Sequence, residues 1–234
     1  MVGGAEPQFW IVAGCNGAGK TTLTRHYFRS RTAGEPLIDL SATWINPDAT
    51  TVDLRGLYAD FSLTGANLAA ADVSLRRLED HIGSRRPALI ETVLASDKYL
   101  APVERARAAG FSIHLIYVTL ESPDLAIARV RQRVQQGQHD VPPEKVRQRW
   151  SRSMLHLMQF IPLLDELKVF DNSSCQTGTL PPLVISKDPD GPFRNLRPDL
   201  LPEIQRLLTM MQQADDPAGT IAALIRQDRT RPPD

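Results

Sequence analysis

The chain has 234 residues, of which 42% are hydrophobic and 23% are charged, values typical of a soluble globular protein. This length supports one compact domain, or one domain with a short appendage, and excludes disorder across the whole chain. The 27 basic and 27 acidic residues give a net charge of +0. Such a balance argues against a protein built for nonspecific nucleic-acid binding. No apolar run approaches the roughly 18 residues that a membrane helix needs.

The compartment is predicted from the N-terminus and the cysteines. No basic segment followed by a long apolar core opens the chain, so we expect no secretory signal peptide. The two cysteines, Cys15 and Cys175, form neither a metal-ligand spacing nor a disulfide framework. We therefore expect a reducing, cytoplasmic compartment.

Short apolar runs predict five buried strands, over residues 9–13, 43–46, 88–92, 112–119 and 167–171. Between them, helices are predicted over about 19–30, 68–82, 98–109, 122–136 and 142–160. The helix over 68–82 should bury apolar positions 68, 71, 75, 78 and 82. Alternating strands and helices predict an α/β fold, with a mainly parallel sheet of about five strands and helices on both faces.

The composition changes after residue 174, where the chain becomes rich in proline and glycine. We expect residues 1–174 to form the core, with a helical lid near 122–155. Residues 175–234 are predicted to be a C-terminal extension that packs on this core. It should contain one edge strand at 183–186 and two short helices near 200–212 and 217–227.

One motif carries most of the chemical information. Residues 14–21 match the phosphate-binding pattern G-x-x-x-x-G-K-[ST] between a predicted strand and a predicted helix, which is the required context. The backbone N–H groups of such a loop cradle phosphate oxygens, and the following helix adds its positive dipole end. The lysine supplies a charge for the phosphates and the threonine a hydroxyl for Mg²⁺. The predicted cofactor-binding residues here are Gly14, Cys15, Asn16, Gly17, Ala18, Gly19, Lys20, Thr21 and Thr22.

The rest of the sequence narrows the class of P-loop protein. Residues 16–23 resemble the loop of a transporter-type ATPase, but no LSGGQ-like signature and no apolar run ending in Asp-Glu is present. No Asn-Lys-x-Asp guanine-reading motif is present either, so a GTPase is disfavoured. A small-molecule kinase remains. Within the loop, we expect Cys15 to be a packing residue; the alternative is a reactive thiol with a lowered pKa.

Two carboxylates are predicted at the carboxyl ends of strands, the edge that holds the active site in an open parallel sheet. Asp48 follows the strand at 43–46 and is the best candidate for the base that accepts a hydroxyl proton. The alternative for Asp48 is a structural turn. Glu91 ends a buried strand, where an ionised group is costly unless it is used. Glu91 and Thr92 are predicted to bind the acceptor, or Mg²⁺ through water; a cap or a structural ion pair is the alternative.

Arginines gather on the two predicted helices of the lid. Arg129 and Arg133 share one helix face, and further arginines follow on the next helix, after a break at 137–139. Arginines on both arms of a helix–loop–helix suit a lid that stabilises a transferring phosphate. The alternative is that these arginines only cover solvated helix faces.

The ordered set of motifs resembles the zeta toxin family of P-loop kinases, in the bacterial branch labelled predicted ABC-type ATPase. The similarity spans about residues 9–174, and Val93 and Ala95 stand where the family usually has Thr and Ser. It rests on the loop at 14–21, Ile45-Asn46-Pro47-Asp48, Glu91-Thr92-Val93-Leu94, residues 129–134, 137–142 and 147–153, and Asp171-Asn172-Ser173.

The resemblance implies a nucleoside- or shikimate-kinase-like fold, with ATP and Mg²⁺ as cofactors. It implies phosphorylation of a hydroxyl, which in characterised relatives is the sugar 3′-hydroxyl of UDP-N-acetylglucosamine, and neutralisation by an antitoxin protein. By motif position, Lys20 and Thr21 would serve phosphate and metal, Asp48 would be the base, and Glu91 would lie on the acceptor side. Arg133 and Arg149 would clamp phosphate.

Two other functions stay open at this point. One is a kinase of the same fold with a different acceptor, such as a nucleotide, another metabolite or a nucleic-acid end. The other is a nucleotide-gated regulatory protein that binds ATP. Retention of Lys20 and Thr21 argues against a loop that has lost its activity.

Overall fold

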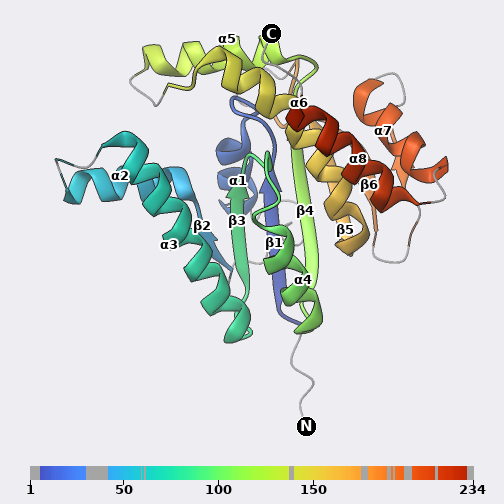
Figure 1. Ribbon diagram of the computed structural model, residues 1–234, viewed down its shortest axis with the longest axis horizontal. Helices are drawn as coiled ribbons and strands as arrows, with labels where there is room; N and C mark the ends of the chain where they lie inside the picture. Colours follow the sequence, from blue (N-terminus) through green and yellow to red (C-terminus); the bar gives the residue numbers. More distant parts are fainter. Residues whose placement is uncertain are drawn as a thin grey trace.

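The computed structural model describes residues 6–29, 42–58, 60, 62–136, 140–174, 179–188, 191, 193–197, 202–213 and 216–230. One seven-stranded sheet, in the order β2-β3-β1-β4-β5-β6-β7, runs through these residues. Helices lie on both of its faces (Figure 1). In the described ranges, no helix is both long and apolar enough to cross a bilayer.

Five strands pair in parallel, as predicted: β1 (Gln8–Ala13), β2 (Thr43–Ile45), β3 (Ala88–Thr92), β4 (Ser112–Thr119) and β5 (Glu166–Asp171). Two antiparallel strands, β6 (Leu183–Lys187) and β7 (Arg194–Asn195), extend the sheet beyond β5. The predicted count of about five was therefore too low. Strand β6 includes residues 183–186, where an edge strand was predicted, but it is not at the edge, because β7 pairs with its outer side. The two-residue β7 is too short to produce a detectable alternation in the sequence.

The apolar runs of the parallel strands are continuous because both faces of the sheet are covered. Along β1, Phe9, Ile11 and Ala13 point into one core, whereas Trp10 and Val12 point into the other. The first core contains residues of α3 (Leu63–Gly83), α4 (Leu100–Ala108), α6 (Pro143–Phe160), α7 (Pro202–Gln213) and α8 (Pro217–Thr230). The second contains residues of α1 (Lys20–Arg29), α5 (Pro123–Gln135) and the start of α6.

The helix α2 (Pro47–Leu57) was not predicted, because Pro47-Asp48 was interpreted only as the end of a strand. Asn46 accepts hydrogen bonds from the Asp48 and Ala49 amides, at 2.9 and 3.2 Å, and so caps this helix. Proline at the first helical position completes a normal N-terminus. Helix α2 packs against α3 at one side of the sheet (Figure 1).

Helix α3 begins five residues earlier than predicted, and its buried face differs from the predicted one. Leu68 is exposed and Ala71 is half-buried. The apolar periodicity was correct only in its second half, where Leu78 and Ile82 are buried, because small residues fill the face near α2. The buried positions of α3 are Ala66, Ala70, Ser74, Leu78, His81 and Ile82.

The elements after residue 174 contribute to the hydrophobic core of the sheet. Ile204 of α7 and Ile221 of α8 belong to the same buried cluster as residues of β1, β4 and β5. Helix α8 lies along α6 (Figure 1), where Arg152 and Asp228 form an ion pair at 2.7 Å. The predicted break of the lid at 137–139 falls outside the described residues.

Candidate active site

The phosphate-binding loop joins β1 to α1, at the carboxyl edge of the sheet. Gly14 has a φ of +143°, and a Cβ there would lie 2.0 Å from the Val118 carbonyl oxygen of the neighbouring strand. Only glycine fits this close approach. Lys20 Nζ donates hydrogen bonds to the carbonyl oxygens of Gly14, at 2.9 Å, and Cys15, at 3.1 Å. The loop therefore keeps its lysine folded over its own backbone.

A turn after β5 supports the loop from the side. Asn172 Nδ2 donates to the Ala18 carbonyl oxygen at 2.8 Å, and it would lie 2.5 Å from a Cβ at Gly19, whose φ is +94°. Arg129 Nη2 in turn donates to the carbonyl oxygens of Asn172, at 2.7 Å, and Ser173, at 3.2 Å. These contacts hold the loop, the turn and helix α5 in one arrangement.

The acidic side of the site is built by the ends of β2 and β3 and by the start of α1. Asn46 uses its carbonyl oxygen to cap α2, and its Nδ2 donates to Glu91 Oε2 at 3.1 Å. The first turn of α2 then carries Asp48, which is exposed to solvent at the cavity. Thr21 Oγ1 donates to the other oxygen of Glu91 at 2.5 Å. Asn46 therefore positions both Asp48 and Glu91, and Thr21 connects Glu91 to the phosphate-binding loop.

Glu91 is only 6% exposed. Burial raises the pKa of its carboxyl group, because the ionised form loses hydration, and the negative charge of Asp48 adds to this rise. Lys20 and the hydrogen bond from Thr21 oppose it. A buried carboxylate that shares its oxygens with a loop hydroxyl is an arrangement suited to a bound cation.

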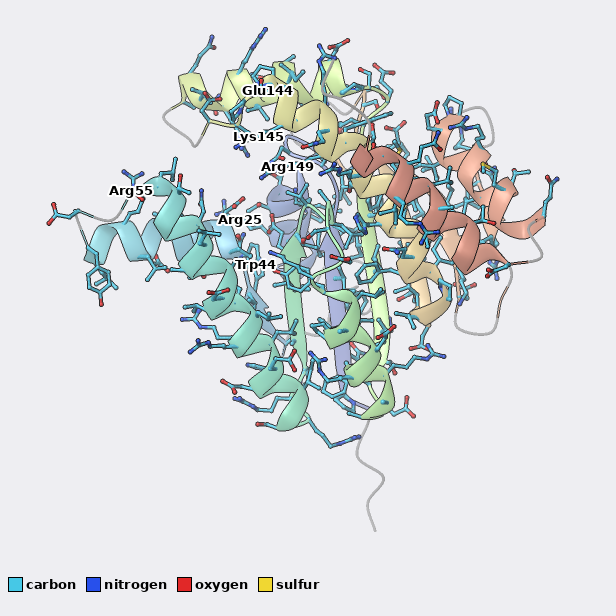
Figure 2. All side chains as sticks on the ribbon, viewed as in Figure 1. Arg25, Trp44, Arg55, Glu144, Lys145 and Arg149 are labelled. Atoms are coloured by element: carbon cyan, nitrogen blue, oxygen red, sulfur yellow. The ribbon has the colours of Figure 1, made fainter. Side chains whose placement is uncertain are left out.

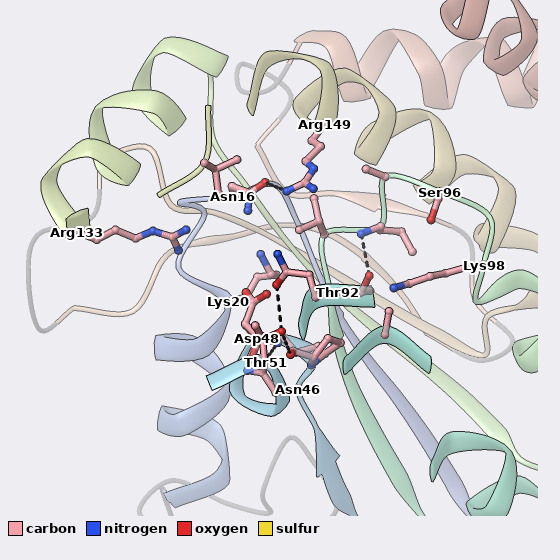
Figure 3. Close-up of a pocket in the computed structure, with 18 residues that line it drawn as sticks. Asn16, Lys20, Asn46, Asp48, Thr51, Thr92, Ser96, Lys98, Arg133 and Arg149 are labelled. Atoms are coloured by element: carbon pink, nitrogen blue, oxygen red, sulfur yellow. Dashed lines mark hydrogen bonds between the residues drawn. The ribbon is translucent and has the colours of Figure 1, made fainter. Parts of the chain in front are cut away.

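These groups surround a cavity of about 370 Å³ (Figure 3). Seven of its lining residues belong to the set predicted from the sequence: Asn16, Lys20, Asp48, Glu91, Thr92, Arg133 and Arg149. The Thr92 hydroxyl accepts a hydrogen bond from the Leu94 amide at 3.0 Å. The cavity combines four cations and two carboxylates, enough charge to bind a polyanion and leave a base beside it.

The lid arginines differ in what they contact. Arg149 reaches from α6 toward the loop (Figure 2), where Nη1 donates to Asn16 Oδ1 at 3.2 Å. Arg133 points into the cavity from α5 (Figure 3), and its buried Nε has no hydrogen-bond partner among the described residues. Arg147 instead pairs with Asp124 at the surface, at 2.7 Å.

The other predicted site residues lie around the cavity rather than in its lining. Thr22 is exposed on α1, and Arg129 faces the supporting turn. Cys15 is buried, and burial raises the pKa of its thiol to about 11 despite the positive charges of Lys20 and Arg129. The alternative of a reactive thiol with a lowered pKa was therefore wrong. The remaining residues outside the lining are Gly14, Gly17, Ala18, Gly19 and Thr21.

Sequence reasoning missed two kinds of lining residue. Asn46 was detectable, because an asparagine before Pro-Asp is a helix-capping signal. Thr51, Asn67 and Lys98 carried no such signal, since they reach the cavity only through the packing of α2 on α3 and the path of the chain after β3.

Comparison with known proteins identifies the family. Residues 2–177 match the sequence model described as zeta toxin. The chain belongs to the zeta toxin family. As a zeta toxin family member, it is a P-loop protein of the kinase type, and its fold is the one predicted from the resemblance.

Solved structures share this zeta toxin fold at low sequence identity. The crystal structure of AvrRxo1-ORF1:-ORF2 with ATP has a TM-score of 0.61 at 17% identity, covering 96% of this chain and 77% of that one. The PezAT chromosomal toxin-antitoxin system of Streptococcus pneumoniae has a TM-score of 0.51 at 15% identity, covering 72% and 69%. An uncharacterised protein of Haemophilus influenzae is 24% identical over 146 residues, which are 58% of this chain and 88% of the relative.

Proposed function

We propose that this chain is an ATP-dependent small-molecule kinase of zeta toxin type, which transfers the γ-phosphate of ATP to a hydroxyl of a small acceptor. The observation that carries the proposal is the cavity itself, in which Asp48 and Lys20 line the same space under Arg133 and Arg149. Phosphoryl transfer needs a phosphate cradle, cations over the transferring group and a residue that accepts the hydroxyl proton. The loop that carries Lys20, the two arginines and Asp48 are our candidates for these three tasks.

In this mechanism Lys20 and the loop N–H groups bind the β- and γ-phosphates. The acceptor oxygen forms a bond to the γ-phosphorus as the bond from that phosphorus to the bridging oxygen breaks. Asp48 accepts the hydroxyl proton, and ADP leaves. Arg133 and Arg149 stabilise the negative charge of the transferring group. The buried Arg133 Nε, which has no hydrogen-bond partner in the part of the chain that the structure describes, supports this role. Arg129 acts on the nucleotide through the turn that holds the loop.

The residues fit Mg²⁺ as the second cofactor. Thr21 Oγ1 and Glu91 Oε1 converge at 2.5 Å, and hydroxyl and carboxylate oxygens are hard ligands of the kind this ion prefers. Thr21 and Glu91 would hold the ion beside the phosphates. When bound, Mg²⁺ neutralises charge on the phosphates. Thr92 and the exposed side of Asp48 face the acceptor.

We propose UDP-N-acetylglucosamine as the acceptor to test first, and a toxin role for the kinase with an antitoxin protein as its partner. Family membership supports both proposals. Two structural neighbours are also a complex of AvrRxo1-ORF1 with -ORF2 and a toxin-antitoxin system. We further propose that the kinase acts in the cytoplasm, where ATP and nucleotide sugars are both available.

Mass spectrometry of small molecules tests the proposal. The protein is incubated with Mg²⁺-ATP and a panel of nucleotide sugars, nucleotides, nucleosides and sugars. We expect one class of acceptor to gain a phosphate. Asp48→Asn should lower turnover by about 10²-fold or more, the scale of a lost general base, while ATP binding persists. Asp53→Asn, an exposed carboxylate on the same helix, is the matched control.

Three outcomes separate the possible functions. Transfer to UDP-N-acetylglucosamine that disappears in Asp48→Asn supports the full proposal. Transfer to another panel member keeps the kinase and replaces the acceptor. ATP binding with no transfer and no ATP turnover would overturn the kinase proposal and favour a nucleotide-gated regulatory role. Lys20→Ala should abolish transfer; normal turnover in that variant would remove the loop from the mechanism.

A further inference from the structure

A buried chain of two hydrogen bonds links β4, α6 and the turn that follows β3. Tyr117 Oη donates to Ser153 Oγ at 2.9 Å, and Ser153 Oγ donates to the Val93 carbonyl oxygen at 2.7 Å. Tyr117 is 2% exposed and Ser153 is 0% exposed. Because a carbonyl oxygen can only accept, the single proton of the serine hydroxyl is committed to Val93, and the tyrosine supplies the proton of the other bond. Both hydroxyls therefore have partners away from solvent.

The turn that receives this bond is strained and lines the cavity of the candidate active site. Leu94 has a φ of +58°, in the left-handed region that residues with a side chain rarely adopt, and it is 1% exposed. Such a conformation persists only where surrounding contacts hold it. Two hydrogen bonds contribute here, because the Leu94 amide donates to the Thr92 hydroxyl at 3.0 Å and Ser153 binds the carbonyl of Val93. These three turn residues line the cavity, directly after Glu91.

Ser153 also fixes the helix that carries Arg149. The two residues are four positions apart on α6, so they share one helix face. Arg149 reaches from that face to the phosphate-binding loop, where its Nη1 donates to Asn16 Oδ1 at 3.2 Å (Figure 3). Apolar packing is non-directional and does not by itself set the rotation of a helix about its axis. The bond from Ser153 to the end of β3 does set it, together with a bond from Trp150 Nε1 to the carbonyl oxygen of Leu120, after β4, at 3.2 Å.

We propose that Ser153 is a positioning residue for phosphoryl transfer, which sets the place of Arg149 over the γ-phosphate of ATP relative to the strand end that carries Glu91. The inference rests on the proposed kinase function and adds a residue to its machinery. Ser153 lies outside the cavity lining and acts through Arg149. A serine that only stabilised the fold would leave the affinity of the folded protein for the γ-phosphate unchanged, so the two roles differ in a measurable quantity.

Calorimetry with the full chain and Mg²⁺ measures this role without a known acceptor. The probes are ADP and a non-hydrolysable ATP analogue, whose affinities differ by the contacts made to the γ-phosphate. We expect wild type to bind the analogue more tightly than ADP. Ser153→Ala should reduce that preference by about 10-fold, the lower end of what a hydrogen bond to a charged group contributes, and leave the ADP affinity unchanged. Ser153→Thr keeps the hydroxyl and should restore most of the preference. Ser151→Ala, half-buried on the same helix, is the control.

A double-mutant cycle tests whether Ser153 acts through Arg149. Arg149→Ala should lose the preference for the analogue by itself, and Ser153→Ala should cause no further loss in that background. Ser153→Cys nearly keeps the volume of the side chain but donates weakly. It serves for the same comparison if the alanine variant does not fold.

The outcomes separate this inference from the kinase proposal. Additive losses in the double variant, equal weakening of ADP and analogue binding, an unchanged preference in Ser153→Ala, or no preference in wild type would overturn the positioning role. A wild type that prefers the analogue but phosphorylates no acceptor would reject the proposed kinase, while the cycle would still measure the link between Ser153 and Arg149. Where an acceptor is found, Ser153→Ala should lower kcat by about 10- to 100-fold, the scale of a small misplacement, with little change in the KM of the acceptor. A rise in that KM at constant kcat would overturn the proposal.

Discussion

At the scale of single residues, Glu91 is a buried carboxyl group that is expensive to ionise and that lies in the proposed metal site. Its carboxyl group is buried, shares its oxygens with Thr21 and Asn46, and has a raised pKa. A raised native pKa means that the folded protein binds more protons than the unfolded chain at weakly acidic pH. The free energy of unfolding therefore falls as pH rises from the ordinary glutamate pKa to the native value, and then stays level.

Glu91→Gln should remove this dependence. In the nucleotide-free protein without Mg²⁺, we expect the difference in unfolding free energy between wild type and variant to decline with rising pH over that interval. Kinase activity should drop by about 10- to 100-fold, as for other carboxylates that serve a metal site. Urea denaturation across pH, together with turnover, measures both effects. Glu144→Gln, on the exposed face of α6 (Figure 2), controls for the loss of one carboxyl. Parallel stability curves for Glu91→Gln and wild type would contradict the account of Glu91.

Gly19 is a position where only glycine fits without strain. Its φ is +94°, and a Cβ at this position would lie 2.5 Å from the side-chain amide of Asn172. Gly19→Ala should lower the free energy of unfolding by roughly 1–3 kcal/mol through backbone strain and weaken ATP-analogue binding, because Asn172 must release the Ala18 carbonyl. Denaturation and calorimetry measure the two effects. Gly56→Ala in α2, where a Cβ meets nothing within 4 Å, should be neutral or stabilising. Equal behaviour of the two variants would show that the loop accommodates a Cβ.

At the scale of elements, the two lid helices bring arginines of unequal importance to the site. Arg149 contacts Asn16 of the loop and Arg133 points into the cavity, whereas Arg147 pairs with Asp124 at the surface. We expect Arg149→Ala and Arg133→Ala each to lower kcat by about 10²-fold or more, the scale of a lost charge-stabilising group. Arg147→Ala should change stability and turnover little, because an exposed ion pair contributes at most about 1 kcal/mol. Similar losses in all three variants would instead indicate a general disruption of the lid.

Elements also explain what the sequence could and could not predict. The five parallel strands were predictable because their runs are apolar throughout, and the loop motif because each of its positions is set by phosphate chemistry. Asp48 and Glu91 line one cavity because parallel strand ends share an edge, and Arg149 reaches the same cavity from helix α6. The helix α2 was missed because Pro47-Asp48 was interpreted as the end of a strand and not as the start of a helix. Lys98 was missed because the local sequence does not show that the loop after β3 faces the cavity beside α2 and α3.

At the scale of the whole molecule, the segment beyond the family match extends the same structure. The match ends at residue 177, yet β6 and β7 continue the kinase sheet, and α7 and α8 cover the core beside α6. The structural similarity to AvrRxo1 covers 96% of this chain, so it runs well past the end of the family match. Helix α6 connects the two regions, because it carries Arg149 over the loop and pairs through Arg152 with Asp228 of α8.

This arrangement predicts one cooperative unfolding unit. Ile221 of α8 is 1% exposed and lies in the core cluster that contains β4, β5 and α6 residues. Ile221→Ala should lower the free energy of unfolding by about 2–5 kcal/mol, the cost of a cavity in a packed core, and should move one single transition followed by both circular dichroism and activity. Val52→Ala, 70% exposed on α2, should stay within about 0.5 kcal/mol of wild type. If Ile221→Ala instead produced an early transition that left kinase activity intact until a later one, the extension would be an independent domain. In that case the helix that carries Arg149 would hold its place over the loop without support from α8.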